Sequence, residues 1–311
     1  MHSFLNYQNV GLGVLIVAVA SLLFATGATI QHLAAATVVD PDAENKSMNL
    51  KQLWRLITTP RWLGGLALIT IGALAHITAL MMAPVTVVQP VGILAVPWSV
   101  LMAAKIHRHK VTGTMWFAVL LTVVGVVGFT VISGTNAALD TRVEPPIVIL
   151  GCVVIYAIGA FFGMLGWRGK NGMLRSMMWA TGGSFFYGLS SALIKSVSVM
   201  MRDAQFQTSP LFWVIVPFLV GCYLIGGAMI QQGYATGPAE TVVASMTVTD
   251  PIVGVSFGLI ILGEGVLISL LEASGMVVAA AIAVYGVFLL SKHHPDAVER
   301  REAQQSAVGS G

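Results

Sequence analysis

Asp250 is the residue whose type and position most strongly suggest chemistry. It lies in the middle of an apolar run, residues 239–262, directly before Pro251. A carboxylate at the centre of a membrane-spanning helix costs about 2.5–3.5 kcal/mol on insertion scales, so an ionisable group there points to a functional site. An isolated buried charge is prohibitively costly, so we expect Asp250 to be protonated, paired, hydrogen-bonded or facing a wet cavity. The alternative to a transport role is a structural hydrogen bond beside Pro251.

Three more polar residues in apolar segments are candidates for substrate or ion binding. Glu240 and Thr247 share one broad helical face with Asp250. Glu240 lies near the inner end of its segment, where a carboxylate that caps the helix is equally ordinary. Gln89, which precedes Pro90, could line a cavity together with backbone carbonyls.

Two basic residues complete the candidate set. His76 lies on a face of small residues, which predicts a packing interface, so an interhelical hydrogen bond and a proton relay both remain open. Lys195 follows Ser184, Tyr187 and Ser191 along one stripe. It lies near the outer end of its segment, where it either snorkels to the interface or pairs with Asp250 or Glu264. Glu264 itself is interpreted as a turn residue at the outer mouth.

The composition identifies the elements that must position these residues. Hydrophobic residues make up 56% of the 311 residues and charged residues 9%, whereas a soluble domain carries about 25% charge. We therefore expect an all-α polytopic membrane protein. Segments of about 20 mainly apolar residues can span a membrane. Nine qualify: 10–36, 62–82, 85–104, 113–133, 147–167, 173–200, 211–232, 239–262 and 266–290.

The basic residues predict how the chain is inserted. With residues 1–9 outside and the tail 292–311 in the cytoplasm, the inner loops collect nearly all Lys and Arg, and the outside receives only Arg142 and Arg202. This predicts a multi-pass protein of the plasma membrane. The polar stretch 40–61 cannot cross and is expected to form an amphipathic segment in the interface.

Proline spacing indicates an internal repeat. Pro84 and Pro97 are 13 residues apart, and so are Pro238 and Pro251. The segments that carry them have opposite predicted orientations, which is typical of transporters built from inverted repeats. We expect a first half over residues 10–134, a linking segment and helix over 135–168, and a second half over 169–291. Pro90, Pro97 and Pro251 are the expected helix breaks.

Several of these motifs resemble a known family. The motifs on which this resemblance rests are Ala83-Pro84, Gln89-Pro90-Val91-Gly92-Ile93-Leu94, Asp250-Pro251 and Leu262-Gly263-Glu264. In this order they resemble the NIPA-like branch of the drug/metabolite transporter (EamA-type) superfamily, which also has a lysine at the position of Lys195. Val91 stands where the branch has Leu, and residues 105–110 close the first half without the Gly-Glu pair. The resemblance implies a drug/metabolite transporter fold.

The predicted function is secondary transport of a small polar solute by alternating access. Coupling of this transport to protons through Asp250 is a further hypothesis. The family resemblance implies a rival, movement of Mg²⁺, for which Asp250 and Glu240 are the obvious hard-anion ligands in the spans. A second rival is a membrane scaffold or lipid-handling accessory without transport. We expect no enzyme activity and no cofactor. Gly159 and Gly163 form a GxxxG pair that predicts tight packing or a homodimer contact.

Overall fold

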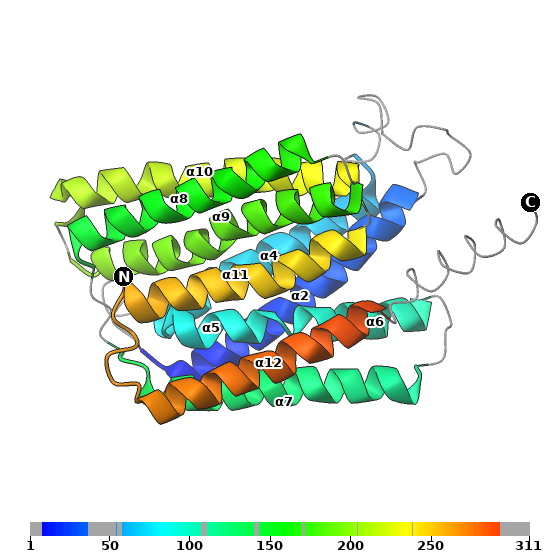
Figure 1. Cartoon of the computed structure of the whole chain (residues 1–311), viewed down its shortest axis with the longest axis horizontal. Coiled ribbons are helices and arrows are strands. Elements are labelled where there is room, and N and C mark those ends of the chain that lie inside the picture. Colours follow the sequence, from blue (N-terminus) through cyan, green and yellow to red (C-terminus); the bar gives the residue numbers. More distant parts are fainter. Residues whose placement is uncertain are drawn as a thin grey trace, which may run out of the picture.

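The computed structural model describes residues 8–36, 54, 58–106, 111–139, 143–169, 172–203, 205–237 and 239–292, and every regular element in them is a helix. Along the chain these are α2 (Val10–Ala36), α4 (Pro60–Met82), α5 (Val85–Gly92), α6 (Ala95–Ile106), α7 (Gly113–Asn136), α8 (Pro145–Arg168), α9 (Gly172–Met200), η1 (Phe206–Thr208), α10 (Pro210–Thr236), α11 (Ala239–Ile260) and α12 (Leu270–Lys292). The long helices lie side by side along one axis (Figure 1).

The bundle has the surface of a membrane protein. Within the described ranges, eight helical stretches are long and apolar enough to cross a membrane, with α5 and α6 counted as one. Large apolar side chains cover their outer surface, among them Leu15, Leu150, Leu224 and Phe288. An apolar exterior is stable only in lipid. The chain is therefore a polytopic helical membrane protein.

The predicted segment that is not among these eight, 173–200, forms α9. This helix has 29 residues, about 44 Å at 1.5 Å per residue, but its composition is too polar to count among the eight. It packs against α8, α10, α11 and α4, and its serines and glycines are mostly buried. A helix covered by protein on most sides needs no lipid-compatible surface, so the count of nine spans stays a prediction.

Glycines bring several helix pairs into backbone contact. A Cβ on Gly27 of α2 would lie 2.7 Å from the carbonyl oxygen of Gly65 on α4. In the same way, a Cβ on Gly183 of α9 would lie 2.9 Å from the carbonyl oxygen of Gly226 on α10. Gly125 on α7 meets the backbone of Ala283 on α12. Such small-residue contacts are the usual interface between membrane helices.

The two halves of the chain share a pattern of contacts. In the first half α2 packs on α4, α5 and α6, and in the second half α9 packs on α10 and α11. The last helix of each half, α7 and α12, then pair with each other at one side of the bundle (Figure 1). With α5 and α6 counted as one, each half thus has four long elements, α2, α4, α5–α6 and α7 in residues 10–134 and α9, α10, α11 and α12 in residues 169–291.

Helix ends differ from the predicted ends where glycine or proline intervenes. The segment 85–104 is two helices, because the chain turns after Gly92 and α6 starts at Ala95. Pro97 is the third residue of α6, where its missing N–H falls among the first-turn amides that have no helical partner anyway. The last helix begins at Leu270, after a turn in which Gly263 has a φ of 72°.

The predicted break at Pro251 is wrong. α11 continues unbroken from Ala239 to Ile260 with Pro251 inside it. The proline removes only one hydrogen bond, the one its missing N–H would donate to the carbonyl of Thr247. Pro90 likewise lies inside α5 and leaves the carbonyl of Thr86 without its helical donor.

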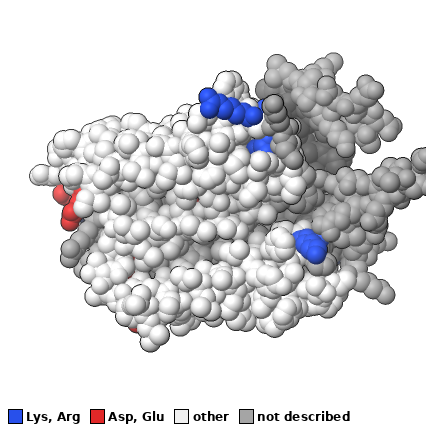
Figure 2. Space-filling model, in the orientation of Figure 1, with Lys and Arg blue, Asp and Glu red and all other residues white. Residues whose placement is uncertain are grey.

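On the face that Figure 2 shows, charges of the two signs lie at opposite ends of the bundle. Figure 2 shows Lys and Arg near one end and Asp and Glu at the other. The basic residues in the last helical turns are Lys105, Arg168 and Lys292. This separation agrees with the charge bias that predicts the orientation. Of the predicted interfacial segment 40–61, only Trp54 and residues 58–61 are described, and most of the predicted tail lies outside the described residues.

Candidate functional site

The centre of the candidate site is a hydrogen bond between α5 and α11. Gln89 donates from Nε2 to Oδ1 of Asp250 over 3.0 Å. Gln89 is buried and Asp250 half-buried. The two helices approach this closely because α11 carries a glycine opposite the amide: a Cβ on Gly254 would lie 2.5 Å from Nε2 of Gln89. Asp250 is thus hydrogen-bonded, one of the states expected for a mid-membrane carboxyl.

Three more polar side chains surround this pair. Asp250 is an electrostatic neighbour of Tyr187 on α9 and Tyr223 on α10, whose ring centroids are 6.2 Å apart. His76 on α4 is a polar neighbour of Gln89. We call these five residues, from five helices, the central polar cluster. His76 and Asp250 are both half-buried, so the helices around the cluster do not cover these two residues completely.

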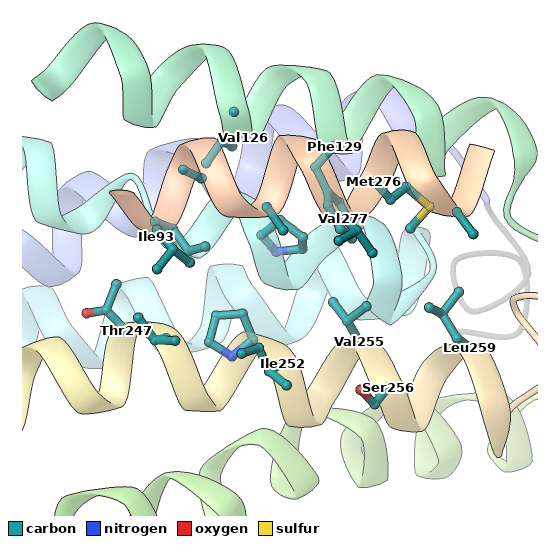
Figure 3. A pocket seen from close by; sticks show the side chains of 18 of the residues that line it. Ile93, Val126, Phe129, Thr247, Ile252, Val255, Ser256, Leu259, Met276 and Val277 are labelled. Carbon is teal, nitrogen blue, oxygen red and sulfur yellow. The ribbon is translucent and has the colours of Figure 1, made fainter. Parts of the chain in front are cut away.

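A cavity of about 290 Å³ lies beside α5 and α11 (Figure 3), and its lining includes neither Gln89 nor Asp250. Most of its lining is apolar, with the hydroxyls of Thr247 and Ser256 as the polar exceptions. The prolines that follow Gln89 and Asp250 both line it. Its remaining walls come from α7 and α12: Gly125, Val126, Phe129, Ala273, Met276, Val277, Ala280, Ala283 and Val284.

The cavity is open toward the membrane-facing surface. Two of its lining residues, Ile252 on α11 and Val277 on α12, are 57% and 68% exposed. The two helices that carry them make few contacts with each other. The cavity therefore faces the lipid side of the bundle between α11 and α12.

The turn between α4 and α5 is held by two buried charged residues. The carboxylate of Glu264 accepts from the backbone N–H of Val85 and of Thr86, each at 2.8 Å, and from the Thr86 hydroxyl at 2.5 Å. On the other side of Pro84, Nζ of Lys195 donates to the carbonyl of Ala83 over 2.9 Å. The first contacts satisfy orphan N–H groups of a helix, and the last satisfies an orphan carbonyl. Both charges suit the local helix dipoles.

The structure corrects the interpretation of both residues. Lys195 is 1% exposed and does not snorkel. Glu264 does lie in the turn after α11, but its side chain is fully buried and reaches back to α5. Sequence reasoning missed this contact because the partners are 178 and 179 residues apart. The one available signal was the Gly-Glu pair of the family resemblance.

The other predicted residues are scattered. Thr247 lines the cavity and donates its hydroxyl to the carbonyl of Val243. Glu240 lies in α11, but its side chain is outside the described residues. Among the described residues no three His, Cys, Asp or Glu side chains gather into a metal site, so the predicted Mg²⁺ ligand pair of Asp250 and Glu240 stays a prediction.

The GxxxG pair on α8 is used inside the chain. A Cβ on Gly159 would lie 2.6 Å from the Phe186 ring on α9, and one on Gly163 would lie 2.9 Å from Met229 on α10. Both glycines are buried by these contacts. The pair therefore serves tight packing within the chain, and the predicted homodimer contact stays a prediction.

The comparisons with known proteins give one full-length relative. The chain is 24% identical to an uncharacterized protein of Corynebacterium glutamicum, and the match covers 90% of this chain and 95% of that protein. No family model and no solved structure matches the chain.

Proposed function

We propose that this protein is a secondary transporter of the drug/metabolite type, which moves a small solute by alternating access. The observation that carries the proposal is Asp250, an ionisable group halfway along α11 that contacts Gln89 of α5 and remains accessible. Intramembrane carboxyls of this kind mark substrate and proton pathways. The surrounding cluster adds hydroxyl, amide and imidazole groups that a polar solute could bind.

The arrangement of the helices supports alternating access. Residues 10–134 and 169–291 repeat the same order of contacts, and α5 and α11 meet at the centre with Gln89 and Asp250 facing each other. In transporters with inverted repeats the substrate site lies at the interface of the repeats near the midplane. The central polar cluster has that position if the two halves are such repeats.

Asp250 would couple transport to the proton gradient. A proton taken up by Asp250 on one side of the membrane and released on the other would be exchanged against the solute. The hydrogen bond from Gln89 to Asp250 joins α5 to α11. Binding of a solute or a proton at Asp250 would therefore compete with this bond and loosen α5 from α11.

A lipid-handling role is the second candidate, and the lateral cavity favours it. The cavity opens toward the membrane, and its lining is almost wholly apolar. Such a lining suits a hydrocarbon chain better than a polar solute, because polar groups buried there without hydrogen-bond partners cost free energy. In this role the protein would bind a lipid through the cavity, and Asp250 would act only as a structural hydrogen-bond acceptor.

The test compares cells that overproduce the wild type, Asp250→Asn or the control Asp203→Asn, at equal amounts in the membrane. Asp203 is an exposed loop residue that accepts from the N–H of Gln205. Untargeted profiles of metabolites, metals and lipids are recorded for each. The proposal expects a solute whose level changes with wild type and control but returns to the empty-vector level with Asp250→Asn.

Other outcomes choose between the rivals. A change confined to Mg²⁺, with growth rescue of a strain deficient in magnesium uptake, would favour the cation transporter. A lipid that changes equally in all three would favour lipid handling. Solute profiles that are identical for wild type and Asp250→Asn would refute the role of Asp250.

A further inference from the structure

The position of α5 depends on its anchors. It has only 8 residues, fewer than the roughly 12–15 that an isolated helix needs to persist in water, and the chain turns at both of its ends. Its N-terminus is held by Glu264 and its middle by Asp250. Both acids belong to one unit, since α11 leads directly into the turn that carries Glu264.

The two contacts share one register. Gly258 lies opposite Thr86, with 3.0 Å from a Cβ to the hydroxyl oxygen, and Gly254 lies opposite Gln89. The two glycines are four residues apart on α11, and Thr86 and Gln89 are three apart on α5, so both pairs lie on facing sides of antiparallel helices. A shift of α5 along α11 would therefore break the Glu264 contacts and the Gln89–Asp250 bond together.

Lys195 supplies the opposite charge near the buried carboxylate of Glu264. Glu264 is fully buried, and Lys195 is a buried positive charge within its electrostatic reach on the other side of Pro84. A buried charge without a counter-charge is strongly destabilising. Each residue therefore makes the other tolerable while each holds one side of the turn.

We propose that Lys195 and Glu264 are positioning residues that hold α5 in register against α11, so that Gln89 reaches Asp250. This inference rests on the proposed function in one respect, because it takes the Gln89–Asp250 bond as the contact that transport uses. The hydrogen bonds of Lys195 and Glu264 go to the backbone of residues 83–86 and to the Thr86 hydroxyl, so both residues act on the Gln89–Asp250 pair through this turn.

The experiment measures how fast the Asp250 carboxyl is chemically modified. The probe is N,N′-dicyclohexylcarbodiimide, which modifies protonated carboxyls in apolar surroundings. Purified full-length protein is labelled over a range of pH, and modification of the Asp250 peptide is followed by mass spectrometry. Asp250→Asn gives the background. The variants are Glu264→Gln, which places an amide donor against backbone donors, and Lys195→Met.

The control is Glu272→Gln. Glu272 is also a helix-capping carboxylate: it accepts from the N–H of Ser269 at the start of α12 over 2.7 Å, and Ser269 caps in return. It holds α12 rather than α5. A general effect of lost helix capping would therefore appear in this control as well. An effect that depends on the position of α5 would not appear in it.

The expected result is labelling of Asp250 about three- to tenfold faster in Glu264→Gln and Lys195→Met than in the wild type, as loss of one hydrogen bond predicts. Glu272→Gln should label like the wild type. If a single variant does not fold because it leaves one charge unpaired, the double variant Lys195→Met/Glu264→Gln removes both charges and should show the same faster labelling.

Two results would overturn the inference in distinguishable ways. Wild-type labelling rates in the folded variants, single or double, would refute the positioning role and leave the proposed function standing. An Asp250 that is labelled in neither wild type nor variants would refute both, because the carboxyl would then be neither accessible nor released by movement of α5.

Discussion

Gln89 donates to Asp250 over 3.0 Å, and the residue after each of them is a proline that lines the same cavity. One side of the contact between α5 and α11 is therefore polar and the other side apolar. Pro90 and Pro251 cannot complete the helical hydrogen bonds before them, so the backbone is weakened on both helices next to the bond that joins them. Each helix can therefore bend more easily here than where its hydrogen bonds are complete.

Replacement of Gln89 by Leu should destabilise the protein. Oδ1 of Asp250 would lose its donor, and a buried polar group left without a partner costs about 1–3 kcal/mol. The change should be smaller in the background of Asp250→Ala, which removes the acceptor, because the pair interacts and its effects are not additive. Thermal unfolding of the four proteins in detergent measures this. Additive effects would mean that the bond contributes nothing to stability.

Gly254→Ala should separate Gln89 from Asp250 without changing either residue. A methyl group there would meet Nε2 of Gln89 at 2.5 Å, so the amide must move. We expect loss of the solute change defined above. Gly64→Ala on α4 is the matched control, since a Cβ there meets nothing within 4 Å and Ala should stabilise the helix by about 0.5–1 kcal/mol. Full activity in Gly254→Ala would show that the close approach is dispensable.

Long apolar helices could be predicted from the sequence with good precision. The segment 113–133 became α7, Gly113–Asn136, and the segment 239–262 became α11, Ala239–Ile260. Uninterrupted hydrophobicity of the length of a bilayer is a local property, so it can be read locally. A break at Pro90 and Pro97 was predicted, and the structure places it between them, after Gly92. Its exact position could not be predicted, because each proline lies within a helix and the packing around α5 decides where that helix ends.

The site was predictable in part for the same reason. Asp250, Gln89 and His76 stand out because each is a polar residue in an apolar segment, and the structure brings them together. The contacts of Glu264 and Lys195 are long-range pairings with the turn at residues 83–86, which no local pattern encodes. A lysine near a helix end snorkels when lipid surrounds it; Lys195 does not, because α9 is covered by other helices.

Filling the lateral cavity tests whether it takes part in function. Ala280 on α12 lines the cavity, whereas its neighbour Ala281 is exposed and does not. Ala280→Phe should fill part of the 290 Å³ and reduce the solute or lipid change, and Ala281→Phe should not. The profiles of cells with equal amounts of each variant give the answer. Equal profiles for the two variants would make the cavity a passive packing gap.

Gly125→Val should disrupt the pair formed by α7 and α12. The backbone of Ala283 fills the space where a side chain would lie, and a backbone cannot move aside as a flexible side chain can. We expect a loss of stability at the upper end of the 1–3 kcal/mol usual for overpacking. Gly128→Ala is the control, because its Cβ would make an ordinary contact of 3.5 Å with Ala279. Thermal unfolding in detergent compares the two.

The predicted orientation can be checked with single cysteines at the two charged ends of the bundle. Cys152 and Cys222 are free and buried and can be replaced by Ala to give a background without thiols. Asp203→Cys marks the acidic end and Arg168→Cys the basic end. Because positive loops stay in the cytoplasm, a membrane-impermeant maleimide added to intact cells should label the first cysteine and spare the second until the membrane is opened. The reverse pattern would invert the topology. It would also reverse the side from which Asp250 takes its proton in the proposed cycle, while leaving the contact with Gln89 unchanged.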